Sequence, residues 1–340
     1  MTKQCIGILS IAFGLPFLVG QEPASNPDAT KKKQSFKRTP PPGVNAPGVK
    51  RQMTAIQPLA VFDTGGTPDW QVVTSDAVWV SNGPTNTVHR LDATRNTIAA
   101  NVMVGKKPCS GVTTGFGSVW VPNCVDQTIS RVSLTTNAVE ATIAVGPAES
   151  EGGITASADA IWLVTDKLGK LSRIDPKTNT VIAEVVIPAG SASCEFSDGA
   201  VWVTTPGKNM LTRVDAKTNK VTHSITVGPQ PRFLTHGAGS IWTLNQGDGT
   251  VTRVDTKSRK VVASIELGVP GPGGEIAFGL GHVWATIFQI PITEIDPITN
   301  KVVRQWVGAG GDSIRVAHGS IWLSNLREHN VWRIDPQKLQ

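Results

Sequence analysis

Short runs of alternating apolar and polar residues recur along this chain with a period of about 40 residues. The clearest marker is a tryptophan between small or apolar neighbours, with spacings of 41, 42, 40, 40, 42 and 38 residues. It occurs at Trp79, Trp120, Trp162, Trp202, Trp242, Trp284 and Trp322. Sequence periods of this length made of short strands are typical of solenoids and β-propellers. The pattern therefore predicts seven structural repeats.

Each repeat contains four predicted strands. In the fifth repeat they lie at 233–236, 240–244, 250–254 and 261–267. The last shows period-2 alternation, with Val261, Ala263, Ile265 and Leu267 on one face, as expected of a half-buried outer strand.

The turns between the third and fourth predicted strands also repeat. They begin at Asp175, Asp215 and Asp296 and end four residues later at an asparagine. Aspartate opens such turns by accepting backbone N–H groups, and asparagine tolerates the left-handed conformation that closes them. We interpret these residues as structural.

The two ends of the repeat region complement each other. The seventh repeat stops after 331–335, without room for a fourth strand, while a lone strand at 56–62 precedes the first repeat. Pairing the two would close the ring and protect its edges. The predicted fold is all-β, a seven-bladed β-propeller of four-stranded blades spanning residues 54–340, with the last blade closed by the N-terminal strand.

The first 53 residues differ from the rest. Residues 1–20 read as a signal peptide, with an uncleaved anchor as the alternative, because the apolar run is short for a membrane span. Residues 21–53 are rich in Pro and Lys and are expected to form a disordered basic linker. We therefore expect an exported protein, periplasmic or extracellular.

The net charge of +6 resides entirely in this leader, because the remaining residues carry 24 basic and 24 acidic groups. A neutral propeller makes nucleic acid an unlikely partner. Membrane contact is expected only through the N-terminal segment, and the protein is expected to be a monomer.

Two resemblances follow from these units. Segments 200–204 and 212–220 resemble the bacterial YVTN-type propeller repeats, except that the chain has no tyrosine and tryptophan takes its place. This resemblance covers roughly residues 54–336 and implies the fold but little about function.

The chain is more distantly similar to virginiamycin B (streptogramin) lyases, which are also seven-bladed. That resemblance implies a magnesium site with histidine and glutamate at the starts of the innermost strands. The matching ring here contains no histidine, and Arg232 occupies a place where a catalytic histidine is expected.

The starts of the innermost strands are where the repeats differ most from one another. The residues expected to form a binding site at this channel mouth are Asp69, Trp70, Glu151, Glu195, Arg232, Phe233, Glu275, Asp312 and Arg315. Carboxylates and guanidinium groups orient a polar ligand, while aromatic rings cover its apolar face. Alternatively, these charges pair only with each other and with water.

Glu275 and Asp312 are the candidates for a divalent cation, Mg²⁺ or Ca²⁺. Two glycine-rich loops, 270–274 and 308–311, are expected to let the backbone approach the channel or a ligand closely. The six histidines match no zinc motif and are interpreted as ordinary packed or solvated residues.

Cys109 and Cys124 flank a predicted hairpin centred near Phe116, which places them opposite each other on adjacent strands. An oxidising compartment would allow a disulfide between them. Cys194 is expected to be unpaired and buried.

The function favoured by the sequence is binding of a small polar ligand or an envelope protein at the channel mouth. The alternative is a lyase or lactonase-like hydrolase with a metal-assisted acidic site in the same mouth. Its reacting group would be Glu275 or Asp312, with Arg232 stabilising an anionic intermediate.

Overall fold

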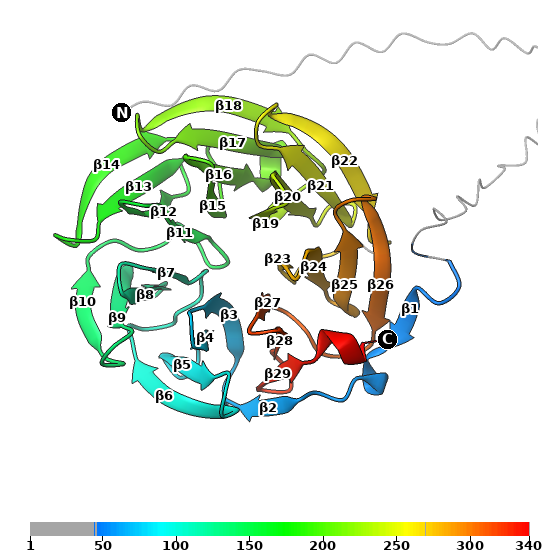
Figure 1. The fold of residues 1–340 in the computed structure, drawn as a ribbon. Coiled ribbons are helices and arrows are strands. Elements are labelled where there is room, and N and C mark those ends of the chain that lie inside the picture. The colour runs from blue at the N-terminus through cyan, green and yellow to red at the C-terminus, as the bar shows by residue number, and fades with distance from the viewer. Residues whose placement is uncertain (1–43, 45, 269, 340) are drawn as a thin grey trace, which may run out of the picture. The chain divides into compact units, whose positions relative to one another are not determined.

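Seven antiparallel sheets are arranged in a ring, as the tryptophan period predicts (Figure 1). The computed structural model describes residue 44, residues 46–268 and residues 270–339. In each blade the first strand lies next to the central channel and the fourth lies at the outside. No helix among these residues has the length and apolar character needed to cross a membrane.

The first four blades follow the chain order. They are formed by β3 (Pro68–Val73), β4 (Ala77–Asn82), β5 (Thr87–Asp92) and β6 (Thr97–Met103); β7 (Thr113–Gly115), β8 (Ser118–Asn123), β9 (Thr128–Ser133) and β10 (Val139–Ile143); β11 (Ile154–Ala156), β12 (Ile161–Asp166), β13 (Lys170–Asp175) and β14 (Thr180–Val186); and β15 (Cys194–Ser197), β16 (Ala200–Thr205), β17 (Met210–Asp215) and β18 (Lys220–Thr226).

The last three blades complete the ring. They contain β19 (Pro231–Gly237), β20 (Ser240–Asn245), β21 (Thr250–Asp255) and β22 (Lys260–Glu266); β23 (Ile276–Gly279), β24 (His282–Ile287), β25 (Ile290–Asp296), β26 (Lys301–Val307) and β1 (Lys50–Gln52); and β27 (Ile314–Ala317), β28 (Ser320–Asn325), β29 (Asn330–Ile334) and β2 (Ala60–Asp63). Three short 3-10 turns lie at Met53–Ala55, Pro206–Lys208 and Pro336–Lys338.

The closure of the ring by the N-terminal strand is confirmed. β2 pairs antiparallel with β29, with Phe62 opposite Val331. The Phe62 ring is buried against Trp322, with ring centroids 5.4 Å apart. The predicted strand begins four residues too early, because residues 56–59 lead into β2 without pairing as a strand.

The structure also adds a strand that the sequence did not suggest. β1 pairs in parallel with β26 and gives the sixth blade a fifth strand. Val44 and Met53 on either side of it are buried. The expected disorder therefore does not hold for residues 50–53, because these residues gain backbone pairing and apolar contacts from the sixth blade. Residues 1–43 lie outside the described part of the chain.

The repeat tryptophans form the core, and each is at most 2% exposed. In five blades an arginine from the third strand lies over the tryptophan ring, for example Arg253 at 4.8 Å from the Trp242 centroid. The same guanidinium donates to Pro297 O and Asn300 Oδ1 in the next blade. This arginine therefore links neighbouring blades, a role the sequence analysis missed.

The turn predictions hold, and one strand prediction needs adjustment. Asn179, Asn219 and Asn300 have positive φ angles of 58°, 56° and 54°. In the outer strand of the fifth blade, Ile265 is buried but Val261 is 44% exposed. A register shift opposite Arg253 and Val254 inserts an extra residue, and such a bulge interrupts the side-chain alternation.

Candidate functional site at the channel mouth

Four of the predicted acids gather at one end of the channel. Asp69 lies at the start of β3, whereas Glu151, Glu275 and Asp312 lie in the loops that enter β11, β23 and β27. The negative charges of Glu151, Asp312 and Glu275 all act on Asp69. Four segments that are far apart in the sequence thus supply one acidic cluster.

Burial and mutual repulsion change how these acids ionise. Desolvation, then the charges of Glu151 and Asp312, raise the pKa of Asp69 well above its usual range. Burial and the charge of Asp312 raise the pKa of Glu151 to about 7. Burial raises the pKa of Asp312 to about 6, although a hydrogen bond from Asp69 and another from the Gly274 amide oppose that rise. Burial and the neighbouring charges therefore favour the neutral form of Asp69 most strongly.

Glu275 differs from the other three acids because its charge is already compensated. Its Oε1 lies 2.5 Å from Nη2 of Arg315. Its Oε2 accepts hydrogen bonds from the Ser313 hydroxyl and, at 3.3 Å, from the Ile314 amide. Both carboxylate oxygens are therefore occupied by groups of the seventh blade.

Arg232 also has a partner, but it is not one of the predicted acids. Its Nη1 donates to Glu149 Oε1 at 2.7 Å and its Nη2 donates to the Ser150 carbonyl at 3.1 Å. The guanidinium also lies 6.0 Å from the centroid of Phe233. Glu149 was not among the predicted site residues, because it lies outside the repeat register and carries no motif.

Two aromatic residues line the channel together with Glu275. Trp70 and Phe233 come from blades on opposite parts of the ring and meet edge to face, with centroids 5.4 Å apart. Together with Ser193, Glu275 and Arg315 they line a cavity of about 380 Å³ in the channel. The structure therefore places aromatic surface and charge around one space.

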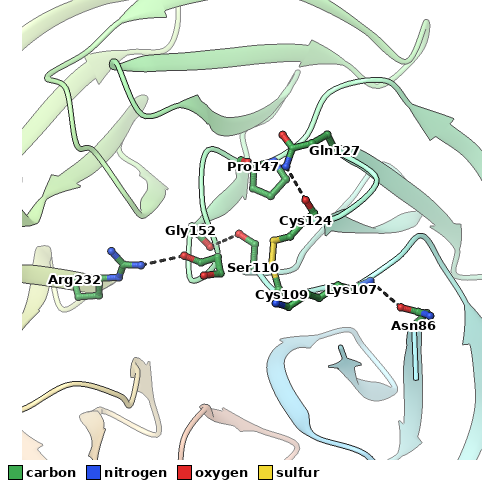
Figure 2. The surroundings of a disulfide bond; sticks show 10 residues. Asn86, Lys107, Cys109, Ser110, Cys124, Gln127, Pro147, Gly152 and Arg232 are labelled. Atoms are coloured by element: carbon green, nitrogen blue, oxygen red, sulfur yellow. Dashed lines mark hydrogen bonds between the residues drawn. A yellow bond between two sulfur atoms is a disulfide. The ribbon is translucent and has the colours of Figure 1, made fainter. Parts of the chain in front are cut away.

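A disulfide lies beside the loop that contains Gly152 (Figure 2), and Glu151 is the residue before Gly152. Cys109 and Cys124 are bonded, with Cα atoms 6.0 Å apart. The Cys109 carbonyl accepts the Glu151 amide at 2.9 Å, and the Ser110 hydroxyl donates to Gly152 O at 2.6 Å. Glu151 has a φ of 62°, a conformation that is uncommon for a residue other than glycine, asparagine or aspartate.

Glu195 lies deeper and does not join the acidic cluster. Its Oε1 lies 2.6 Å from Nδ1 of His236, on the neighbouring β19. Both residues line the channel cavity. The interpretation of the histidines as ordinary packed or solvated residues did not include this pairing, because Glu195 and His236 are 41 residues apart in the sequence.

Of the two glycine-rich loops, 270–274 contacts one of the acids through its last residue. The Gly274 amide donates to Asp312 at 3.3 Å, and Gly274 has a φ of 85°. A Cβ atom there would lie 1.9 Å from the Thr286 carbonyl oxygen, so only glycine fits. Residues 270–272 and 308–311 also border a separate cavity of about 470 Å³ with Phe288 and Arg327.

The metal candidates Glu275 and Asp312 are close enough to interact electrostatically. Within the described residues, no group of three or more His, Cys, Asp or Glu side chains is arranged to hold a metal ion. Cys194, the remaining cysteine of that region, is buried and its thiol contacts the Gly153 carbonyl at 3.2 Å.

Comparison with known proteins identifies the fold but no family. No known family profile matches the sequence, and no curated protein matches it. Among solved structures, a streptogramin B lyase matches with a TM-score of 0.67 and 18% identity, over 79% of this chain and 93% of that one.

A catalytically inactive virginiamycin B lyase from Staphylococcus aureus, solved with quinupristin, matches with a TM-score of 0.71 and 17% identity, over 82% and 98% of the two chains. Hydrazine synthase from Kuenenia stuttgartiensis matches with a TM-score of 0.65 and 15% identity, over 84% and 97%. At these identities the likeness shows a shared propeller fold. The similarity to YVTN repeats stays a prediction.

Proposed function

We propose that the channel mouth binds a small organic cation, a protonated amine with an apolar or aromatic body. The observation that carries this proposal is the group formed by Asp69, Glu151 and Asp312. These three carboxyl groups are crowded together, and none forms an ion pair with a basic side chain in the described part of the chain. A bound cation would stabilise their ionised forms.

The walls of the cavity support the same ligand class. The face of an indole attracts a cation, and a buried site strengthens that attraction. Trp70 directly follows Asp69 in the chain, and Trp70 and Phe233 supply aromatic surface in the cavity that Glu275 also lines. Trp70 Nε1 and Ser193 Oγ are buried without a hydrogen-bond partner among the residues described, so the site also has polar groups left for a ligand's acceptor atom.

The experiment compares benzylamine with benzyl alcohol, which has nearly the same shape but no charge. We expect benzylamine to raise the melting temperature at pH 7.5, with a stabilisation of about 1.4 kcal/mol at ten times its Kd, and benzyl alcohol to have little effect. The Asp312→Asn variant should lose most of the benzylamine response. Glu266→Gln, on the exposed outer strand of the fifth blade, is the matched control and should keep it.

Equal stabilisation by benzylamine and benzyl alcohol would refute a charge-selective site. An unchanged benzylamine response in Asp312→Asn would place any binding elsewhere. In either case the proposal fails even though the fold is intact.

The lyase alternative requires Glu275 or Asp312 to bind a metal ion or to transfer a proton. Because both oxygens of Glu275 are bonded within the seventh blade, that residue must first release Arg315 and Ser313. Stabilisation by Mg²⁺ or Ca²⁺ that disappears in Glu275→Gln would favour this alternative over amine binding.

We also propose that the protein is exported. The Cys109–Cys124 disulfide supports this, because such bonds persist in oxidising compartments and are rare in reducing ones. An envelope protein bearing an exposed lysine could then present the same ammonium group to the mouth as a free amine.

A further inference from the structure

The deeper part of the channel contains a second set of ionisable residues. The residue of each innermost strand that pairs with the repeat tryptophan defines one ring around the channel, and the residue after it defines a second ring. The first ring contains Val72, Thr113, Thr155, Glu195, Thr235, Ala277 and Arg315. The second contains Val73, Thr114, Ala156, Phe196, His236, Phe278 and Val316.

Only three of these fourteen residues are ionisable, and they are not scattered. Glu195, His236 and Arg315 all line both the 380 Å³ cavity and a further cavity of about 360 Å³ in the channel. Propeller packing does not require charge at these positions, because the other blades fill them with Val, Thr, Ala or Phe. The three departures from the repeat therefore need another explanation.

Glu195 and His236 form a carboxylate–imidazole pair. The 2.6 Å contact joins Glu195 Oε1 to His236 Nδ1, so the carboxylate fixes the tautomer that carries its proton on Nδ1 and leaves Nε2 free to accept one. The hydrogen bond that His236 donates to Glu195 raises the pKa of His236, and the charge of Asp198 acts in the same direction. Half of the His236 side chain is exposed, so water reaches the imidazole.

Arg315 places a guanidinium group, ion-paired with Glu275, on the same space. Its Nη2 is bound to Glu275 and its Nη1 to the Ile314 carbonyl, which holds the guanidinium in place. The residues of β23 that line this space, Ile276, Ala277 and Phe278, are uncharged. A fixed guanidinium beside apolar walls stabilises an oxyanion more strongly than one in water.

We propose that His236, oriented by Glu195, is a general base in the channel and promotes hydrolysis of an uncharged carboxylic ester, with Arg315 facing the acyl oxygen. His236 Nε2 takes a proton from a water molecule while the oxygen of that water bonds to the acyl carbon. The ester C–O bond then breaks, and the departing alkoxide recovers the proton from the imidazolium. One ester and one water give one carboxylic acid and one alcohol.

The test measures turnover of p-nitrophenyl acetate by the full-length protein across pH 5–9. General-base catalysis contributes about 10²-fold or more to a reaction rate. We therefore expect the His236→Gln variant to hydrolyse the ester at least tenfold more slowly than wild type. His223→Gln, on the outer strand β18, is the matched control. It should keep the rate and accounts for acylation of histidines outside the channel.

Glu195→Gln separates a catalytic pair from a structural one. Without the carboxylate the pKa of His236 falls, so the rise of the rate with pH should shift to lower pH and the plateau should drop. Melting temperatures of all variants check that they fold. Equal rates for wild type and His236→Gln, or a Glu195→Gln profile with an unshifted rise, would overturn the proposal.

Binding at the mouth gives an independent result. Benzylamine should still stabilise His236→Gln, because that substitution leaves the acids of the mouth unchanged, although His236 lines the same 380 Å³ cavity as Trp70 and Phe233. Asp312→Asn for amine binding and His236→Gln for esterase activity therefore test different residues around one space.

Discussion

Arg232 and Glu149 form an ion pair with 2.7 Å between Nη1 and Oε1, although they lie 83 residues apart. Glu149 belongs to the loop before the third blade, and Arg232 belongs to β19 of the fifth blade. The pair therefore bridges two blades that are not neighbours in the ring. It compensates Glu149 but leaves Glu151, two residues further on, without an ion pair in the described region.

The raised pKa of Glu151 predicts a specific dependence of stability on pH. Its pKa in the folded protein is about 7, above its usual value of 4.5, so the folded state binds the proton more tightly. The contribution of this carboxyl group to the free energy of unfolding is fully present below pH 4.5 and is lost as the pH rises through 7. Glu151→Gln keeps a neutral side chain at every pH. It should match wild type near pH 5 and exceed it at pH 8 by about 1–3 kcal/mol.

Denaturant unfolding at pH 5, 6, 7 and 8 measures this difference. Glu266→Gln serves again as the control, because its exposed position should give a difference that does not vary with pH. A Glu151→Gln variant that is less stable than wild type at pH 8 would show that the ionised carboxylate is stabilising, contrary to the environment described above.

The disulfide should matter both for stability and for the position of Glu151. It closes a sequence separation of 15 residues, for which loop-closure entropy corresponds to about 3 kcal/mol. We expect Cys109→Ser with Cys124→Ser to lower the free energy of unfolding by about 2–4 kcal/mol. Benzylamine binding should weaken as well, because Cys109 O holds the Glu151 amide.

Thiol counting on the denatured, non-reduced protein is the direct check. Cys109 and Cys124 should contribute no thiol, Cys194 contributes one, and Cys5 adds one more in protein that retains residues 1–20. Cys194→Ser is the control variant, because it removes a cysteine without touching the bridge. Two additional thiols in the wild-type protein would contradict the disulfide.

Much of the fold could be predicted because its determinants are local. A buried tryptophan in each second strand, an aspartate that accepts turn amides and an asparagine with positive φ all leave a signature within a few residues. The closure of the seventh blade could also be predicted. Its repeat lacks a fourth strand, and the N-terminal strand was the only predicted strand that belonged to no repeat. Repetition made each signal visible several times.

The partners of the functional residues could not be predicted in the same way. Arg232 pairs with Glu149, and His236 pairs with Glu195. In both pairs the side chains come into contact only when separate blades pack together. Nothing in their local sequence distinguishes a paired arginine from a free one. Strand β1 was not predicted for a different reason. Its composition resembles that of the linker, and its pairing depends on β26.

The N-terminal closure predicts how three deletions should rank. Removing 54–64 deletes β2, takes Phe62 away from Trp322 and exposes the edge of β29. Burial of one phenylalanine alone is worth about 1.5–3 kcal/mol, so the melting temperature should fall by about 5 °C or more. Removing 21–50 deletes Val44 and the first residue of β1 and should cost less. Removing 21–43 spares every contact described here and should cost least. Differential scanning calorimetry of the three variants measures this order, and equal melting temperatures for the 54–64 and 21–50 deletions would contradict closure by β2.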